Sequence, residues 1–372
     1  MKRHANLMQL IPSIGVTPFL FLIAACGSCY SSIAAPLPQF IGKIAAGKNP
    51  HAVTVDPSGK YAYVANFTSS NISQYTLGTD GTLTPMIPAT VTAGLSPNSV
   101  TIDPSGKYAF VANYGDHSVS QYTIGAGGTL TPMTPATVAT GTWPITVAVE
   151  PSGKYAYVVN QRSNNISQFA ISTNGTLNAM TPATVATGRT PSAVAIEASG
   201  KFAYVTNTGS NTVSQYTIGD HGMLMPMAVA AVASGTTPNS IAIDQSGKYA
   251  YVANLSSNNI SQYTIAANGT LTPMITATVA TSSGPFSIAA DPSGRYIYVM
   301  NSLNNGASGN SVSQYTVGAE GILAAMDTTT FTAGNEPQSI AVAPKGNFVY
   351  VANNLSNDVS QYAIDATLRR QP

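Results

Sequence analysis

A unit of 47 residues that recurs seven times is the feature that most constrains the fold of this chain. Each copy opens with a proline, and an asparagine follows sixteen residues later. The prolines are Pro50, Pro97, Pro144, Pro191, Pro238, Pro285 and Pro337, and the asparagines are Asn66, Asn113, Asn160, Asn207, Asn254, Asn301 and Asn353. Only the last spacing differs, at 52 residues, because a Gly/Asn/Ser-rich loop at 302–310 is longer. A fixed period of this kind indicates a repeat architecture.

Each copy contains four short segments that are typical of β-strands. In the first copy these are residues 52–55, 61–66, 71–77 and 83–92, which are rich in β-branched and aromatic residues and are separated by Gly-containing turns. Seven four-stranded units predict an all-β fold, a seven-bladed β-propeller with four antiparallel strands per blade. Blades packed face to face bury both faces of each sheet, which explains why only 8% of the residues are charged, against about 25% in an ordinary soluble domain.

The two ends of the chain predict how the ring closes. The seventh copy stops after its third strand, and residues 44–50 align with residues 185–191, which close the third copy. The segment near 40–46 is therefore predicted to be the outer strand of the last blade, which removes an exposed sheet edge. The propeller is predicted to span 40–366, followed by a tail at 367–372.

The first 25 residues are typical of a secretion signal, with Lys2 and Arg3 before an apolar stretch that is too short and too interrupted for a membrane span. The sequence Ala24-Ala25-Cys26-Gly27 resembles a bacterial lipobox, so Cys26 is the expected lipidation site and 26–39 a tether. We therefore expect an exported lipoprotein of the cell envelope, held to the membrane by its lipid alone. The alternative is an ordinary signal cut near Ala34 or Ala35, which gives a periplasmic or secreted protein.

The repeat motifs resemble those of a known family. Tyr204-Val205-Thr206-Asn207 spells the signature of the YVTN propeller repeat, and the Asp-Pro-Ser-Gly-Lys-Tyr and Gly-Thr-Leu-Thr-Pro-Met segments are similar to those of the seven-bladed lactonase family, which includes 6-phosphogluconolactonase-type enzymes. The resemblance covers about residues 40–366 and implies the propeller fold. It also implies a catalytic role for His51, because active members have a Pro-His at the start of an inner strand. Gln161 stands where such members tend to have an acid.

Comparison of the copies with one another separates scaffold from candidate site. The turns are nearly invariant, whereas the loops after each Asn and around each Pro vary, and both variable sets belong to one end of the ring. The candidate ligand-binding residues at this channel mouth are Lys48, Asp116, His117, Trp143, Arg162, Arg189, Phe286 and Glu336, beside the candidate catalytic His51. Tyr114 and Asp358 are two further unusual residues of these loops. We expect Lys48, Arg162 and Arg189 to form a polar arc that docks an anionic group, with separate solvated side chains as the alternative.

Two functions remain open from the sequence. The first is a non-enzymatic propeller that binds a protein, a glycan or a small anionic ligand at the channel mouth; the second is a lactone hydrolase, a carboxylic ester hydrolase. A net charge of +1 without a basic cluster argues against nucleic acid. No metal or cofactor motif occurs, so we expect no metal and no cofactor, and a monomer. The turns that repeat an acidic residue and a lysine or arginine in most copies are expected to be structural, with weak ion pairs across the turn. The repeat asparagines are also expected to be structural, each bonding its own backbone at a hairpin end.

Overall fold

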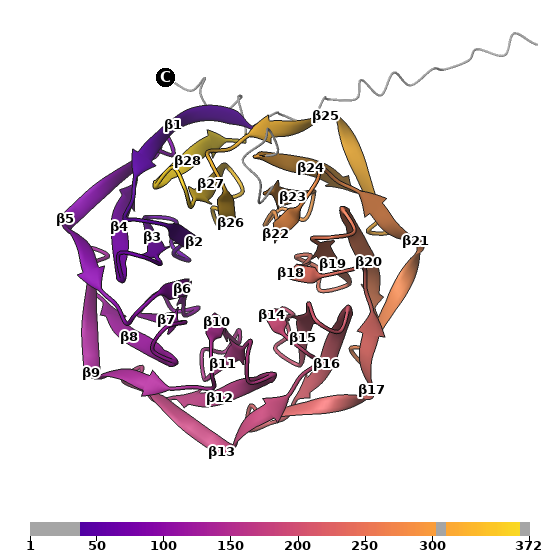
Figure 1. Cartoon of the computed structure of the whole chain (residues 1–372), viewed down its shortest axis with the longest axis horizontal. Coiled ribbons are helices and arrows are strands. Elements are labelled where there is room, and N and C mark those ends of the chain that lie inside the picture. Colours follow the sequence, from indigo (N-terminus) through magenta and orange to yellow (C-terminus); the bar gives the residue numbers. More distant parts are fainter. Residues whose placement is uncertain (1–37, 303–309, 365–372) are drawn as a thin grey trace, which may run out of the picture. The chain divides into compact units, whose positions relative to one another are not determined.

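The computed structural model describes residues 38–302 and 310–364, which form seven antiparallel sheets arranged in a ring (Figure 1). These residues belong to one compact unit, Pro36–Pro372. The signal at 1–25, Cys26, most of the tether, the core of the long loop at 303–309 and the tail at 367–372 lie outside the described residues. In the described ranges, no helix has the length and apolar character needed to cross a membrane.

Four strands with the same relative positions recur in each blade, and the predicted fold is confirmed. The innermost strands are β2 (Pro50–Val55), β6 (Pro97–Ile102), β10 (Pro144–Val149), β14 (Pro191–Ile196), β18 (Pro238–Ile243), β22 (Pro285–Ala290) and β26 (Pro337–Val342). The second strands are β3 (Tyr61–Asn66), β7 (Tyr108–Asn113), β11 (Tyr155–Asn160), β15 (Phe202–Asn207), β19 (Tyr249–Asn254), β23 (Tyr296–Asn301) and β27 (Phe348–Asn353).

The two outer rows complete the blades. The third strands are β4 (Asn71–Leu77), β8 (Ser118–Ile124), β12 (Asn165–Ile171), β16 (Thr212–Ile218), β20 (Asn259–Ile265), β24 (Ser311–Val317) and β28 (Asp358–Ala363). The outermost strands are β5 (Leu83–Thr92), β9 (Leu130–Ala139), β13 (Leu177–Ala186), β17 (Leu224–Ala233), β21 (Leu271–Ala280), β25 (Leu323–Thr332) and, for the seventh blade, β1 (Gln39–Ala45). Strand β1 pairs antiparallel with β28, so the predicted closure by the N-terminal strand is confirmed.

Side chains of the second and third strands join each blade to the next. The Gln74 amide oxygen accepts a hydrogen bond from Leu130 N at 2.7 Å in the following blade, and its nitrogen donates to the Pro88 carbonyl at 3.1 Å in its own blade. The buried Tyr63 hydroxyl donates to the carbonyl oxygen of Gly128. These contacts satisfy polar groups that would otherwise be buried without partners between the sheets.

The same contacts recur across the closure. Gln361 accepts from Leu83 N at 2.7 Å, and the Tyr350 hydroxyl donates to Gly81 O at 2.8 Å. The sixth blade is the exception, because the Gln314 amide oxygen is buried without a partner. Extending the register of β1 by one residue places Pro38 where the other blades have the leucine, and proline has no N–H to donate.

Two structural expectations are corrected in detail. The turn carboxylates bond backbone N–H groups rather than the lysine ammonium groups: Asp56 accepts from Lys60 N at 2.8 Å and from Tyr61 N at 2.7 Å. The repeat asparagines bond chiefly a side chain of the next strand rather than their own backbone, as in Asn66 Nδ2 to Ser73 Oγ at 2.9 Å. Both sets remain structural, because they are buried and the bonds that they make lie inside the blade.

Candidate functional site

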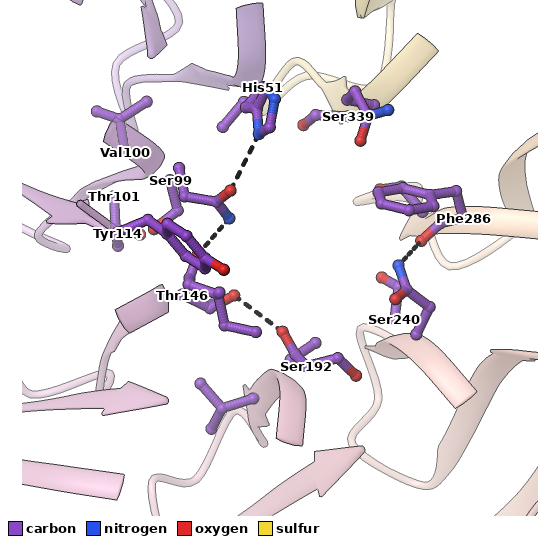
Figure 2. Close-up of a pocket in the computed structure, with 18 of the residues that line it drawn as sticks. His51, Ser99, Val100, Thr101, Tyr114, Thr146, Ser192, Ser240, Phe286 and Ser339 are labelled. Atoms are coloured by element: carbon purple, nitrogen blue, oxygen red, sulfur yellow. Dashed lines mark hydrogen bonds between the residues drawn. The ribbon is translucent and has the colours of Figure 1, made fainter. Parts of the chain in front are cut away.

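The central channel holds a cavity of about 580 Å³. Its wall is built from the first residues of all seven innermost strands, to which the loops after Asn66, Asn113 and Asn160 add Phe67, Tyr114 and Gln161. Figure 2 shows His51 and Tyr114 on one side of the channel, with Phe286 across from them. No Asp, Glu, Lys or Arg lines the cavity, so among the described residues its polar character comes from amides, hydroxyls and one imidazole.

The residue after each repeat proline forms a ring around this channel. Its members are His51, Asn98, Ile145, Ser192, Asn239, Phe286 and Gln338. Neighbouring blades are tied together in this ring: Asn239 Nδ2 donates to Phe286 O at 2.7 Å and Ser192 Oγ donates to Pro238 O at 3.0 Å. The fold thus supplies equivalent positions, and the sequence fills each with a different side chain.

The tautomer of His51 follows from its hydrogen bonds. Asn98 Nδ2 donates to the carbonyl oxygen of Ile145 at 2.9 Å, which fixes the orientation of the Asn98 amide because a carbonyl only accepts. The Asn98 oxygen therefore faces His51 Nδ1 at 3.0 Å, and Nδ1 must carry the proton. Nε2 then has a lone pair, and no residue within 38–302 or 310–364 makes a hydrogen bond to it.

The protonation state of His51 suits the imidazole to act as a general base. Burial lowers the pKa of the imidazole below its ordinary value, and the hydrogen bond to Asn98 opposes this only in part. His51 is consequently neutral at pH 7, with Nε2 able to accept a proton. The ring also stacks on Phe67, with centroids 4.3 Å apart and planes 16° apart, which holds its orientation.

An aromatic row extends from His51 along one side of the mouth. Phe67 lies 5.9 Å from Tyr114 between ring centroids, Tyr114 stacks on Trp143 at 5.2 Å, and the Arg162 guanidinium carbon lies 4.7 Å from the centre of the Trp143 ring. We call His51, Phe67, Tyr114 and Trp143 the aromatic row. It crosses from the first blade to the third.

The structure separates the residues nominated from the sequence. His51 and Phe286 line the channel, whereas Lys48, Asp116, His117, Arg162 and Arg189 are exposed and, like Trp143 and Glu336, are absent from the cavity wall. Backbone bonds anchor two of the basic positions, because Lys48 N donates to Ser69 Oγ and Arg189 N to Ser210 Oγ, each at 2.7 Å. The wall of the channel therefore contains none of the three cations that were expected to share an arc.

Tyr114, noted in the sequence among the unusual residues of the mouth, lines the cavity, whereas two further lining residues, Phe67 and Asn98, were not singled out. Phe67 and Tyr114 are the only aromatic residues that directly follow a repeat asparagine, which is the signal that could have marked Phe67 as well. Asn98 is recognisable only in the structure, since its role depends on the bond to His51 in the adjacent blade. No cluster of three or more potential metal-ligating side chains (His, Cys, Asp or Glu) occurs in the described part of the chain.

Comparison with known proteins identifies the family. The model of the family described as "Lactonase, 7-bladed beta-propeller" matches residues 38–282 and 269–370. The chain belongs to this lactonase family. The expected relationship to 6-phosphogluconolactonase-like propellers is thereby confirmed. No curated protein matches the sequence.

Solved structures agree on the fold. A 6-phosphogluconolactonase candidate from Bacteroides fragilis is 24% identical, with a TM-score of 0.68 over 78% of this chain and 86% of that one. A periplasmic gluconolactonase from Pseudomonas aeruginosa is 19% identical, with a TM-score of 0.64 over 77% and 86%. Hydrazine synthase from Kuenenia stuttgartiensis is also 19% identical, with a TM-score of 0.66 over 87% and 98%. At these identities the likeness concerns the fold, which different activities share.

Proposed function

We propose that this member of the lactonase family hydrolyses a small lactone at the channel mouth, with His51 as general base. The observation that carries the proposal is the Nδ1-protonated, neutral imidazole of His51, whose Nε2 is unoccupied by protein and belongs to the wall of the cavity. Family membership favours this hydrolase over the non-enzymatic binding module.

The reaction requires one proton to move twice. Nε2 removes a proton from water as the water oxygen attacks the lactone carbonyl, and the C–O bond of the ring then breaks as Nε2 returns the proton to the departing ring oxygen. The product is an open hydroxy acid. Asn98 is a positioning residue in this scheme, because its oxygen holds the proton on Nδ1 and keeps the lone pair on Nε2.

The absence of charged side chains from the described cavity wall indicates the charge of the substrate. No cation lines the described wall, so a phosphate or carboxylate would lose hydration there without gaining an ion pair. We therefore propose a neutral lactone rather than a phosphorylated one, recognised by amides and hydroxyls such as those of Gln161, Ser192 and Asn239. The anion formed by ring opening is bound no better than the substrate, which favours its release.

The test compares two histidine variants on glucono-1,5-lactone, with spontaneous hydrolysis subtracted. We expect His51→Ala to lower kcat/KM about a hundredfold or more, whereas His221→Ala, in an exposed hairpin away from the channel, leaves it unchanged. The wild-type chain should prefer glucono-1,5-lactone to its 6-phosphate. Hydrolysis no faster than background, or equal rates for wild type and His51→Ala, would contradict the proposal.

A further inference from the structure

The aromatic row continues past the channel wall, and its outer half has no part in the proposed reaction. His51, Phe67 and Tyr114 line the cavity, but Trp143 does not, although its ring stacks on Tyr114 with planes 20° apart. Trp143 is half-buried, so part of the indole remains accessible to solvent. The row therefore links the base at the channel to an accessible surface two blades further round the mouth.

The fold itself does not require this row. After the repeat asparagines, the fourth to seventh blades have Thr208, Leu255, Ser302 and Asn354 where the first two have Phe67 and Tyr114. Before the repeat prolines, they have Thr190, Thr237, Gly284 and Glu336 where the third has Trp143. All seven blades form the same four-stranded sheet with either kind of residue, so the aromatic residues are not needed for packing within a blade.

Hydrogen bonds made by His117 and Asp116 hold the loops that carry Tyr114 and Trp143 in place. His117 Nδ1 lies 3.1 Å from the Tyr114 carbonyl oxygen and 3.3 Å from Trp143 N, so one of the two bonds forms in either tautomer. Asp116 in the same loop accepts a hydrogen bond from Leu95 N. The loops that carry Tyr114 and Trp143 are thus fixed relative to each other, which lowers the entropy cost of binding a ligand across them.

We propose that Tyr114 and Trp143 form a second subsite, at the rim of the channel, for one further ring of a neutral saccharide. Tyr114 stacks on the Trp143 ring and Arg162 lies over it, so the apolar contact to a sugar comes from the part of the indole that stays accessible and from the side of Tyr114 that lines the cavity. The uncharged amides and hydroxyls of the adjoining channel suit sugar hydroxyls. Burial raises the pKa of Tyr114, opposed in part by Arg162, so its hydroxyl is a neutral hydrogen-bonding group at pH 7. Resting on the proposed function for what occupies the channel, this assigns a disaccharide-sized lactone as the substrate class.

The sequence provides a reporter for the test, since Trp143 is the only tryptophan in the chain. Cellobiose, maltose and lactose are titrated into the propeller, residues 36–372. Binding is followed by Trp143 fluorescence and by calorimetry. We expect at least one of the three to bind, and Tyr114→Ala to weaken it about tenfold. Tyr114→Leu serves if the alanine variant does not fold. Leu255→Ala, at the same place in the fifth blade, is the matched control and should bind as wild type does.

Kinetics separate this subsite from the proposed reaction. Tyr114→Ala should raise the KM for cellobiono-1,5-lactone more than the KM for glucono-1,5-lactone, because only the larger substrate reaches Trp143. Absence of binding of all three disaccharides in both measurements overturns the subsite, even if His51-dependent hydrolysis of glucono-1,5-lactone is observed. Equal weakening by Leu255→Ala overturns it as well. Tyr114-dependent disaccharide binding without any lactone hydrolysis supports the subsite and contradicts the proposed function alone.

Discussion

The two ends of the blades use the same repeat in opposite ways. At the turn end, six blades have a buried Asp or Glu after the innermost strand, and the carboxylates that bond backbone N–H groups hold their turns closed, as Asp56 does. At the mouth end, equivalent positions have different side chains, as in the ring that contains His51, Ser192 and Phe286. The repeated side chains thus satisfy the polar groups of the scaffold, and the candidate chemistry lies where the repeat is broken.

The largest effect should come from removing the strand that closes the ring, on which both ends depend. Deleting residues 38–46 removes β1, leaves the edge of β28 unpaired and takes away the Ala45 carbonyl that accepts from Tyr75 at 2.7 Å. We expect loss of the cooperative unfolding transition, followed by circular dichroism during heating, together with loss of lactone hydrolysis. A truncated domain that melts at the wild-type temperature would refute closure as a source of stability.

A pair of aspartates tests the difference between the ends directly. Asp56→Ala leaves the backbone N–H groups of Ser58, Lys60 and Tyr61 without their acceptor, and we expect the loss of these three partly buried bonds to lower the free energy of unfolding by about 3 kcal/mol. Asp116→Ala, at the exposed mouth end, loses a single bond to Leu95 N and should cost less than about 1 kcal/mol. Urea unfolding of both variants measures this, and equal costs would contradict the comparison.

Acid stability should also reflect the turn end. Burial raises the pKa of Glu197, but hydrogen bonds from Ser199, Lys201 and Phe202 outweigh it and hold the pKa below its ordinary value. A carboxyl with a lowered folded-state pKa contributes stability above its unfolded pKa, and this is lost as the pH falls through the folded value. The stabilising effect of this turn is thus fully present at neutral pH.

The pH profile sharpens the description of the mouth end. Because neutral His51 is the base, kcat/KM should be constant near pH 7 and fall only below the ordinary histidine pKa, since burial lowers the pKa of His51. Asn98→Asp places a carboxylate against Nδ1, which stabilises the imidazolium, and should move this acid limb to higher pH. Asn98→Leu removes the acceptor, and should move the limb to lower pH and reduce kcat about tenfold by freeing the tautomer.

A purely structural role for Asn98 gives a different result. In that case both variants would change the midpoint of urea unfolding and leave the acid limb where it is in the wild type. Ser240→Ala, which removes an inter-blade contact to Ile288 N at 3.3 Å on the opposite side of the channel, is the control for a loss of packing alone.

The sequence predicted the scaffold well because the scaffold is local and repeated. Period, turn chemistry and strand propensity recur seven times, and the alignment of residues 44–50 with 185–191 was enough to predict β1 as the closing strand. His51 was placed at the channel for the same reason, since it directly follows Pro50. Seven copies of the same pattern make the assignment of strands and turns more certain than any single copy would.

The site was harder to predict because it depends on contacts between blades. Lys48 and Arg189 were chosen by charge, but their loops are anchored through backbone N–H groups and their side chains are exposed. The row from Phe67 to Trp143 forms only when loops 29 residues apart or more, on three blades, lie side by side. Nothing in one copy records which face of a loop meets its neighbour, so the stacking of Trp143 with aromatic residues of other blades was not predicted, although Trp143 itself was a candidate.

The smallest predicted effect concerns the one blade in which the turn end lacks its carboxylate. In the seventh blade Ala343 stands where the other six have Asp or Glu, yet its turn has the same backbone bonds, with Ala343 N to Phe348 O at 2.9 Å and Gly346 N to Ala343 O at 2.8 Å. Alanine has no side-chain oxygen, so at this buried position the N–H groups of the turn lack the carboxylate acceptor that Asp56 provides in the first blade.

Ala343→Asp should therefore stabilise the domain by about 1 kcal/mol, measured by urea unfolding, because it supplies the acceptor that the equivalent turn in the first blade already has in Asp56. Ala343→Asn is the control, since an amide oxygen accepts the same bonds without charge and should give a smaller gain. Lactone hydrolysis should be unchanged in both, because the turn lies at the end of the blade opposite the mouth. If Ala343→Asp instead destabilises the domain, the carboxylate turns are tolerated in six blades rather than selected for stability, and the division between scaffold and site would need another basis.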